Sequence, residues 1–141
     1  MRKWVLALTS AITLLAGSTL SAVPANATDT SFQACVQDSC EGTWTAGSIT
    51  WLNRTATLSS VTIFKPEGVD YSATVIFDAF AGTTKIDTQT RTMRTSADRQ
   101  DFPAFTIGDP NLVGGINRIR VQLCENDTTP PFCGIQQNFW R

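Results

Sequence analysis

Apolar and polar residues alternate with a period of two along most of the chain after residue 43. This period is typical of strands that bury one face, and no window shows the three-to-four-residue spacing of an amphipathic helix. Thr, Val, Ile and Phe dominate the alternating segments, and these residues favour extended backbone. The pattern therefore predicts an all-β domain.

About seven short strands are predicted, with turns every 8–12 residues. The clearest one contains Ile119, Val121 and Leu123, which alternate with Arg118 and Arg120. Its apolar residues are expected to face the core and its arginines the solvent. The predicted strands span residues 43–52, 55–64, 71–80, 84–94, 102–107, 116–124 and 133–140.

Three of these segments carry finer signals. Gly47 interrupts the first segment and predicts a β-bulge there. In the second segment, strict alternation places Val61 and Ile63 on one face and Leu58 on the other. The fourth segment contains few apolar residues, which is typical of a strand at the edge of a sheet.

Such a series of short strands predicts a small antiparallel β-sandwich of the immunoglobulin-like type. A closed small barrel is the alternative arrangement. Residues 28–42, by contrast, are polar and carry no periodic signal, so they predict an extended arm with a small loop between Cys35 and Cys40. The sandwich domain is then expected to span residues 43–141.

The beginning of the chain has a different pattern. A basic start precedes an apolar run over residues 4–20, and the tripeptide Ala25-Asn26-Ala27 follows. These are the three parts of a secretory signal peptide, expected over residues 1–27. A membrane anchor is the alternative, but Thr, Ser and Gly interrupt the apolar run and no basic cluster follows it. The sequence predicts cleavage after Ala27 and a secreted, extracellular protein.

Four cysteines lie in the part that is expected to be exported: Cys35, Cys40, Cys124 and Cys133. An even number in an oxidising compartment predicts two disulfides. Proximity along the chain favours Cys35 with Cys40 and Cys124 with Cys133. The long-range pairings stay open, because closing a longer loop stabilises a fold more. A zinc site is the rival interpretation, but the step from Cys124 to Cys133 does not match zinc-ligand spacing.

The charge of the exported part is mildly acidic. Removing Arg2 and Lys3 from the 11 basic residues leaves nine against 12 acidic residues, a net charge of −3. A chain of this charge without a run of Lys and Arg argues against nucleic acid and anionic membranes as partners. Other secreted proteins are the expected partners.

The chain contains no histidine. This excludes Ser-His-Asp and Cys-His catalytic sites as well as zinc bound by imidazole. Only Asp78 lies within an apolar strand, so a hydrolase that used carboxylates would depend on it. A calcium site built from Asp98, Asp101 and Asp109 would lack the EF-hand pattern. The sequence therefore predicts a non-enzymatic protein with no cofactor and no metal site.

Two groups of side chains are candidates for a binding surface. Arg118 and Arg120 form an outward stripe, which Arg91 and Lys85 of another strand are expected to join. Such a stripe suits an acidic partner, although a merely solvated sheet face is the commoner case. The large aromatic residues form the second group. Most of them are expected in the core, with Trp140 at the chain end as the exception.

The third candidate is the loop 125–132, which two prolines and the flanking cysteines are expected to stiffen. Its end, Thr-Thr-Pro-Pro-Phe-Cys, is similar to the reactive loop of Bowman–Birk protease inhibitors. That resemblance covers one loop and would put an aspartate at the specificity position. A hairpin tip that is simply rigid is the alternative. The candidate contact residues are Asp127, Thr128, Pro130, Pro131 and Phe132.

The layout as a whole resembles a set of small secreted actinobacterial proteins. The shared features are an export signal, a polar arm with a Cys-x4-Cys loop, a Thr-rich β domain, and the segment Ile-Asn-Arg-Ile-Arg-Val-Gln-Leu-Cys at 116–124 followed by Cys133. Some proteins of this kind look like adapter subunits of extracellular toxin particles. The resemblance implies a protein-binding or adapter module. A protease inhibitor or a carbohydrate-binding module, acting through the loop or the tryptophans, is the alternative.

Overall fold

The computed structural model describes residues 28–141, and the predicted signal peptide lies outside the described residues. This part of the chain forms ten strands. None of it forms a helix of the length and apolarity that a membrane crossing requires. The strands are β1 (Thr28–Cys35), β2 (Trp44–Trp51), β3 (Ala56–Phe64), β4 (Ala73–Ala81), β5 (Thr84–Met93), β6 (Arg99–Phe102), β7 (Phe105–Ile107), β8 (Arg118–Glu125), β9 (Phe132–Cys133) and β10 (Gln137–Trp140).

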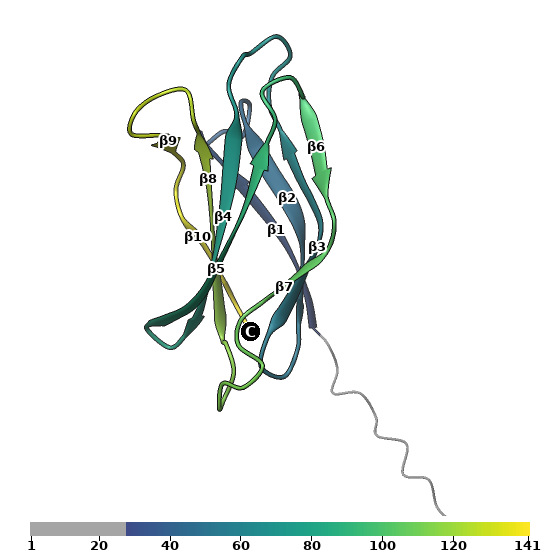
Figure 1. The fold of residues 1–141 in the computed structure, drawn as a ribbon, viewed down its shortest axis with the longest axis vertical. Helices are drawn as coiled ribbons and strands as arrows, with labels where there is room; N and C mark the ends of the chain where they lie inside the picture. Colours follow the sequence, from purple (N-terminus) through teal and green to yellow (C-terminus); the bar gives the residue numbers. More distant parts are fainter. Residues whose placement is uncertain (1–27) are drawn as a thin grey trace, which may run out of the picture.

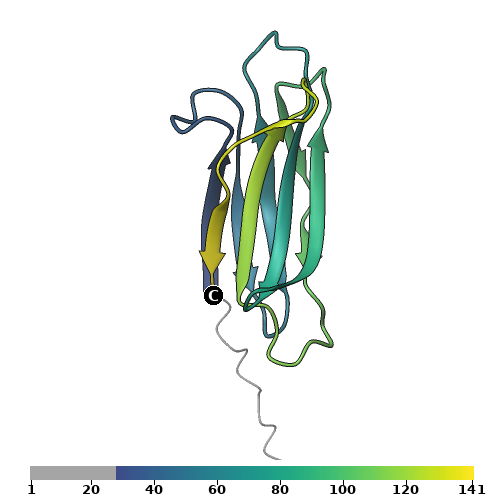
Figure 2. The same cartoon turned by 90° about the vertical axis from the view of Figure 1, so that its left-hand side faces the viewer.

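The strands form two antiparallel sheets that pack face to face (Figure 1). Sheet A has the order β1-β2-β3-β6, and β7 also pairs with β3. Sheet B has the order β10-β8-β4-β5, and β9 also pairs with β8. Figure 2 shows the molecule from the side of sheet B, with β8, β4 and β5 in front. The two separate sheets confirm the predicted sandwich rather than the barrel.

The strand order is immunoglobulin-like. In sheet A, β2, β3 and the neighbours β6 and β7 follow the order of strands A, B and E of that fold. In sheet B, β10, β8 and β4 follow the order of strands G, F and C. β1 adds one strand outside this order at the edge of sheet A, and β5 extends sheet B beside β4.

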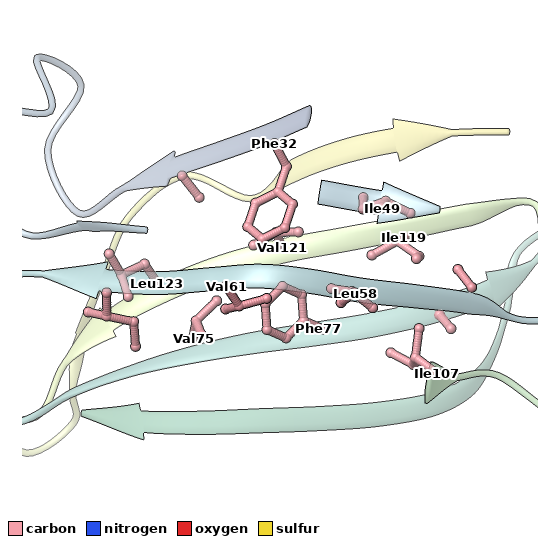
Figure 3. Close-up of a cluster of buried hydrophobic side chains, with 14 of the residues drawn as sticks. Phe32, Ile49, Leu58, Val61, Val75, Phe77, Ile107, Ile119, Val121 and Leu123 are labelled. Atoms are coloured by element: carbon pink, nitrogen blue, oxygen red, sulfur yellow. The ribbon is translucent and has the colours of Figure 1, made fainter. Parts of the chain in front are cut away.

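The core lies between the sheets and consists of the alternate apolar residues of both (Figure 3). Phe77 of β4 is its largest fully buried side chain. Its ring contacts Phe32 edge-on at 5.6 Å and Phe105 at 5.4 Å between ring centroids. The inward residues expected for β8, Ile119, Val121 and Leu123, are all fully buried. The alternation in this strand therefore predicted its buried face correctly.

The predicted N-terminal arm is wrong for residues 28–35. This segment is strand β1, and it pairs with β2 along its whole length from Thr28 to Cys35. Phe32 and Ala34 are buried, with 3% and 1% of their surface exposed, whereas Ser31 and Gln33 face the solvent. The period-two pattern is present but short, because β1 is an edge strand that places only two apolar side chains in the core.

A bulge is present at the position of Gly47, but its extra residue belongs to the facing strand: Gly47 lies opposite two residues of β3, Ser60 and Val61. The β2–β3 register shifts between Ala46 and Ser48, and Ser60 of β3 has a positive φ of 52°. Because of this shift, Leu58 lies in the same core as Val61. The expectation that these two residues face opposite ways was therefore wrong, since strict alternation does not hold across a bulge.

Both locally paired disulfides form, Cys35 with Cys40 and Cys124 with Cys133. Cys124 and Cys133 are direct cross-strand partners in β8 and β9. The next residue, Gly134, lies against β1, where an added Cβ would meet the Cys35 carbonyl oxygen at 1.9 Å. A glycine at this position therefore lets the chain after the second disulfide pass close to the first one.

Candidate functional site

The outer face of sheet B carries a cluster of charged and aromatic side chains near the end where β8 begins. Its members are neighbours in the sheet: Arg118 pairs with Phe80 on one side and with Trp140 on the other, and Arg120 pairs with Asp78. On the β5 side of β4, the cross-strand neighbour of Phe80 is Lys85. We call this cluster the arginine face. It consists of Asp78, Phe80, Lys85, Arg118, Arg120 and Trp140.

Period-two geometry explains why these side chains meet. In β8, Arg118 and Arg120 flank Ile119, whose side chain fills the core, so both arginines point outward. The same rule applies in β10, where Phe139 contacts the Phe32 ring and Trp140 therefore faces away from the core. The sheet pairing then brings the outward residues of four strands together.

Arg118 is held by aromatic rings rather than by a carboxylate. Its guanidinium lies 3.9 Å from the centre of the Phe80 ring and 5.2 Å from that of the Trp140 ring. Its Nη1 donates a long hydrogen bond of 3.4 Å to the Asn138 side-chain oxygen. No carboxylate of residues 28–141 lies within ion-pair distance of it, and its buried Nε has no hydrogen-bond partner. Arg118 is thus an oriented cation whose charge is not compensated.

Arg120, in contrast, is neutralised by Asp78. Arg120 Nη2 donates to Asp78 Oδ2 at 2.6 Å, and Lys85 Nζ lies 3.4 Å from Asp78 Oδ1. The Thr88 hydroxyl donates to the same carboxylate at 2.6 Å. Burial by itself raises the pKa of Asp78, but the hydrogen bonds from Thr88 and Arg120 and the two positive charges outweigh it, so the pKa lies below its usual value. The carboxylate is therefore ionised and fully engaged.

This state of Asp78 bears on the hydrolase alternative. A general acid of a glycosidase needs a raised pKa and a second carboxylate nearby. Asp78 has a lowered pKa and cationic neighbours instead. Its geometry fits the role of a counter-ion inside the arginine face.

Phe80 and Trp140 differ in their exposure. Phe80 points outward but is only 6% exposed, because the guanidinium groups of Arg118 and Arg120 cover its ring. Trp140 is 59% exposed, as expected for the tryptophan at the chain end. The backbone N–H of Arg141 donates to the Asn117 carbonyl at 3.1 Å and holds the end of β10 in place. The face therefore offers a large, partly free indole beside a fixed cation.

The structure separates Arg91 from the other arginines. Its cross-strand partner is Val75, a core residue, so Arg91 lies on the inner side of β5. There its guanidinium lies 3.7 Å from the centre of the Phe105 ring in the opposite sheet. Arg91 thus covers the open edge of the sandwich, while Lys85 joins the outer stripe as expected.

The loop 125–132 lies at the other end of β8. Residues 126–132 are exposed, and Phe132 exposes 54% of its surface. The base of the loop is fixed where Asn126 donates to the Ser72 carbonyl at 2.9 Å. Strand rise separates this loop from Arg118 by roughly 23 Å, so the two candidates do not form one continuous surface. Asp127, Thr128, Pro130 and Pro131 lie with Phe132 in the loop and not near the arginine face.

The three tryptophans of residues 28–141 do not form a common surface on which a sugar could stack. Trp51 is buried, and its Nε1 donates to the Thr30 hydroxyl at 3.2 Å. Trp44 stacks on Phe64 at 4.0 Å between ring centroids, and both belong to sheet A. Trp140 lies in sheet B. One sugar chain therefore cannot stack on several of these indoles at the same time.

Sequence reasoning missed a polar cluster that joins the two sheets at the loop end. The Thr43 hydroxyl donates to Glu125 Oε1 at 2.6 Å, and the Tyr71 hydroxyl donates to the same oxygen at 3.0 Å. Burial, with the neighbouring Glu125 charge, raises the pKa of Tyr71 despite the Thr43 hydrogen bond. These residues are far apart in sequence, and no local pattern marked them as partners. Because the polar groups of this cluster are hydrogen-bonded to one another, the cluster points to a structural role.

A shallow groove of about 240 Å³ lies beside the first disulfide. The Cys35–Cys40 loop and the chain near Ile135 and Gln137 line it, with Gln37 and Asp38 at its side.

Within residues 28–141, no three metal-ligating side chains are grouped closely enough to hold an ion. Asp101, one of the three aspartates considered for a calcium site, instead accepts hydrogen bonds from the side chains of Thr62 and Arg99.

Comparison with known proteins gives no relative for this chain: no protein-family model, no curated protein and no solved structure matches it.

Proposed function

We propose that this protein is a secreted, non-catalytic binding module, an adapter that docks onto another exported protein through the arginine face. The observation that carries the proposal is Arg118, a partly buried guanidinium held by the Phe80 and Trp140 rings that has no carboxylate partner among residues 28–141. A resemblance in layout to secreted proteins that look like toxin-particle adapters supports the same role. The two disulfides suit an oxidising, extracellular environment.

The composition of the arginine face suits protein recognition. Trp and Arg are the residues that most often dominate the binding energy of protein interfaces. Arg118 is already held in place by rings, so little side-chain entropy is lost when a partner binds. Trp140 supplies exposed apolar area next to it. A cation and an indole presented on a rigid sheet form a compact anchor for a partner.

The proposal is tested by capture from the culture medium of the native host. The wild-type protein carries an affinity tag on a long flexible linker after Arg141, which keeps the tag away from Trp140. Two face variants, Arg118→Gln and Trp140→Ala, are compared with two controls on sheet A, Arg99→Gln and Trp44→Ala. A partner that co-purifies with wild type and controls but is lost with both face variants supports the adapter role.

Two results would contradict this proposal. One is a solitary protein in every preparation, with no stoichiometric partner. The other is a partner that is retained by the face variants but lost in Phe132→Ala, which would move the binding site to the loop 125–132 and favour an inhibitor-type role. Circular dichroism of each variant shows whether the fold is intact.

A further inference from the structure

The charges of the arginine face point to the chemistry of the partner. Resting on the proposed function, we propose that the docking segment of the partner presents a carboxylate, from Asp, Glu or a chain terminus, that pairs with Arg118 beside Trp140 and Asn138. The carboxylate would supply a counter-ion that no group among residues 28–141 provides for this guanidinium.

The arginine face carries an excess of positive charge. Arg118, Arg120 and Lys85 contribute three positive charges, and Asp78 contributes one negative charge. Asp78 is occupied by Arg120 and Lys85, each within 3.4 Å of its oxygens. An additional anion is therefore stabilised most at Arg118, because no carboxylate in the described part of the chain pairs with its charge and the guanidinium is only partly solvated.

The geometry favours a planar carboxylate. Two rings hold the guanidinium plane of Arg118, and a held guanidinium presents its N–H groups to a carboxylate in a fixed fork. Asn138 accepts the hydrogen bond from Arg118 through its side-chain oxygen, which leaves its amide nitrogen as a neighbouring donor. The half-exposed Trp140 indole lies on the same side and lowers the local dielectric around the pair.

The same charges disfavour a long polyanion such as a sulfated polysaccharide. Asp78 lies within the stripe and would repel successive anionic groups. The chain from residue 28 onward also has an excess of acidic residues, which opposes the approach of a strongly negative polymer. A single carboxylate flanked by apolar residues matches one uncompensated guanidinium beside one indole.

The probe for this proposal is a pair of short peptides, acetyl-Gly-Leu-Glu-Leu-Gly-amide and its Gln counterpart. Each is titrated into the ¹⁵N-labelled protein while the Trp140 indole N–H and the Arg118 Nε–H signals are followed by NMR. The Glu peptide is expected to shift both signals, with a dissociation constant about tenfold lower than that of the Gln peptide. Raising the salt from about 0.05 M to about 0.5 M should weaken the Glu peptide several-fold.

Matched variants locate the effect. Arg118→Gln should abolish the preference for Glu over Gln, whereas Arg99→Gln, an exposed arginine on sheet A, should leave it unchanged. Arg118→Lys keeps the charge but loses the planar fork, so an intermediate preference is expected. Equal binding of both peptides, or heparin shifting the two signals at lower concentration than the Glu peptide does, would overturn the proposal.

The two proposals fail in different ways. If capture depends on Arg118 and Trp140 but the peptides are not distinguished, the carboxylate proposal is wrong and the adapter role stands. If the Glu peptide is preferred but no exported protein is captured through the face, the carboxylate site stands and the adapter role is wrong.

Discussion

Asp78 sets the charge of the arginine face, since it pairs with Arg120 at 2.6 Å and Lys85 at 3.4 Å and leaves Arg118 alone. It is also a buried carboxylate, with 6% of its surface exposed. Removing one member of a buried, hydrogen-bonded charge pair leaves the partner uncompensated and costs more than the pair gains by forming. The stability of sheet B is therefore expected to depend on the ionisation of the Asp78 carboxylate.

Asp78→Asn is expected to lower the free energy of unfolding by about 2–3 kcal/mol at neutral pH. The pKa of Asp78 is lower in the folded state, so its contribution is complete above the unfolded pKa of about 4 and is lost as pH falls through the folded pKa. The difference between wild type and variant should therefore shrink as the pH falls below about 4. Urea denaturation at several pH values measures it.

The control for this prediction is Asp127→Asn in the exposed loop, which should change stability by less than about 0.5 kcal/mol. A wild-type advantage over Asp78→Asn that is the same at acidic and neutral pH would contradict the ionic role of Asp78.

At the scale of the elements, β1 decides how much of the chain belongs to the sandwich. Its pairing with β2 extends over all eight residues, and Phe32 contacts Phe77 of the opposite sheet. Its Phe32 ring also contacts Phe139 of β10 at 6.1 Å between centroids. β1 therefore joins the two sheets at the edge where β10 ends sheet B, and it is part of the core rather than an arm.

Phe32→Ala is expected to cost about 3–4 kcal/mol of stability, because it removes a buried ring and leaves a cavity. Gln33→Ala in the same strand, whose side chain faces the solvent, should cost less than about 0.5 kcal/mol. Chemical denaturation of the two variants provides the comparison. Equal, small effects of both substitutions would mean that β1 is detachable in solution.

At the scale of the whole molecule, the two disulfides act at one end of a small domain. Both lie where β1 and β8 end, and Gly134 brings the chain after the second disulfide against the backbone of Cys35. A domain of this size buries only about two-thirds of its unfolded surface, so cross-links contribute a large share of its stability. Their shared contact predicts that the two cross-links do not act independently.

Removing either disulfide by paired Cys→Ser substitution is expected to cost about 2–3 kcal/mol. Removing both should cost less than the sum by about 0.5 kcal/mol or more, because the first removal already loosens the contact between Gly134 and β1. A double-mutant cycle from thermal or urea unfolding measures the coupling. Strict additivity would show that the two disulfides stabilise the domain independently of each other.

The sequence by itself determined the features that depend on neighbouring residues. Alternation identified strands β2 to β5 and β8, the buried face of β8, and the outward direction of Arg118 and Arg120. Spacing favoured the local disulfides, and few apolar residues marked β5 as an edge. Each of these follows from the period-two geometry of a strand or from proximity along the chain.

Only the tertiary structure decided features that depend on distant partners. The bulge opposite Gly47 turned Leu58 into the core, and the pairing with β2 made residues 28–35 a strand. Lys65 is buried because its Nζ donates to three backbone carbonyls, those of Val69, Tyr71 and Thr95. Asp78 compensates Arg120 and not Arg118 because cross-strand register, which no single segment encodes, places it opposite the former.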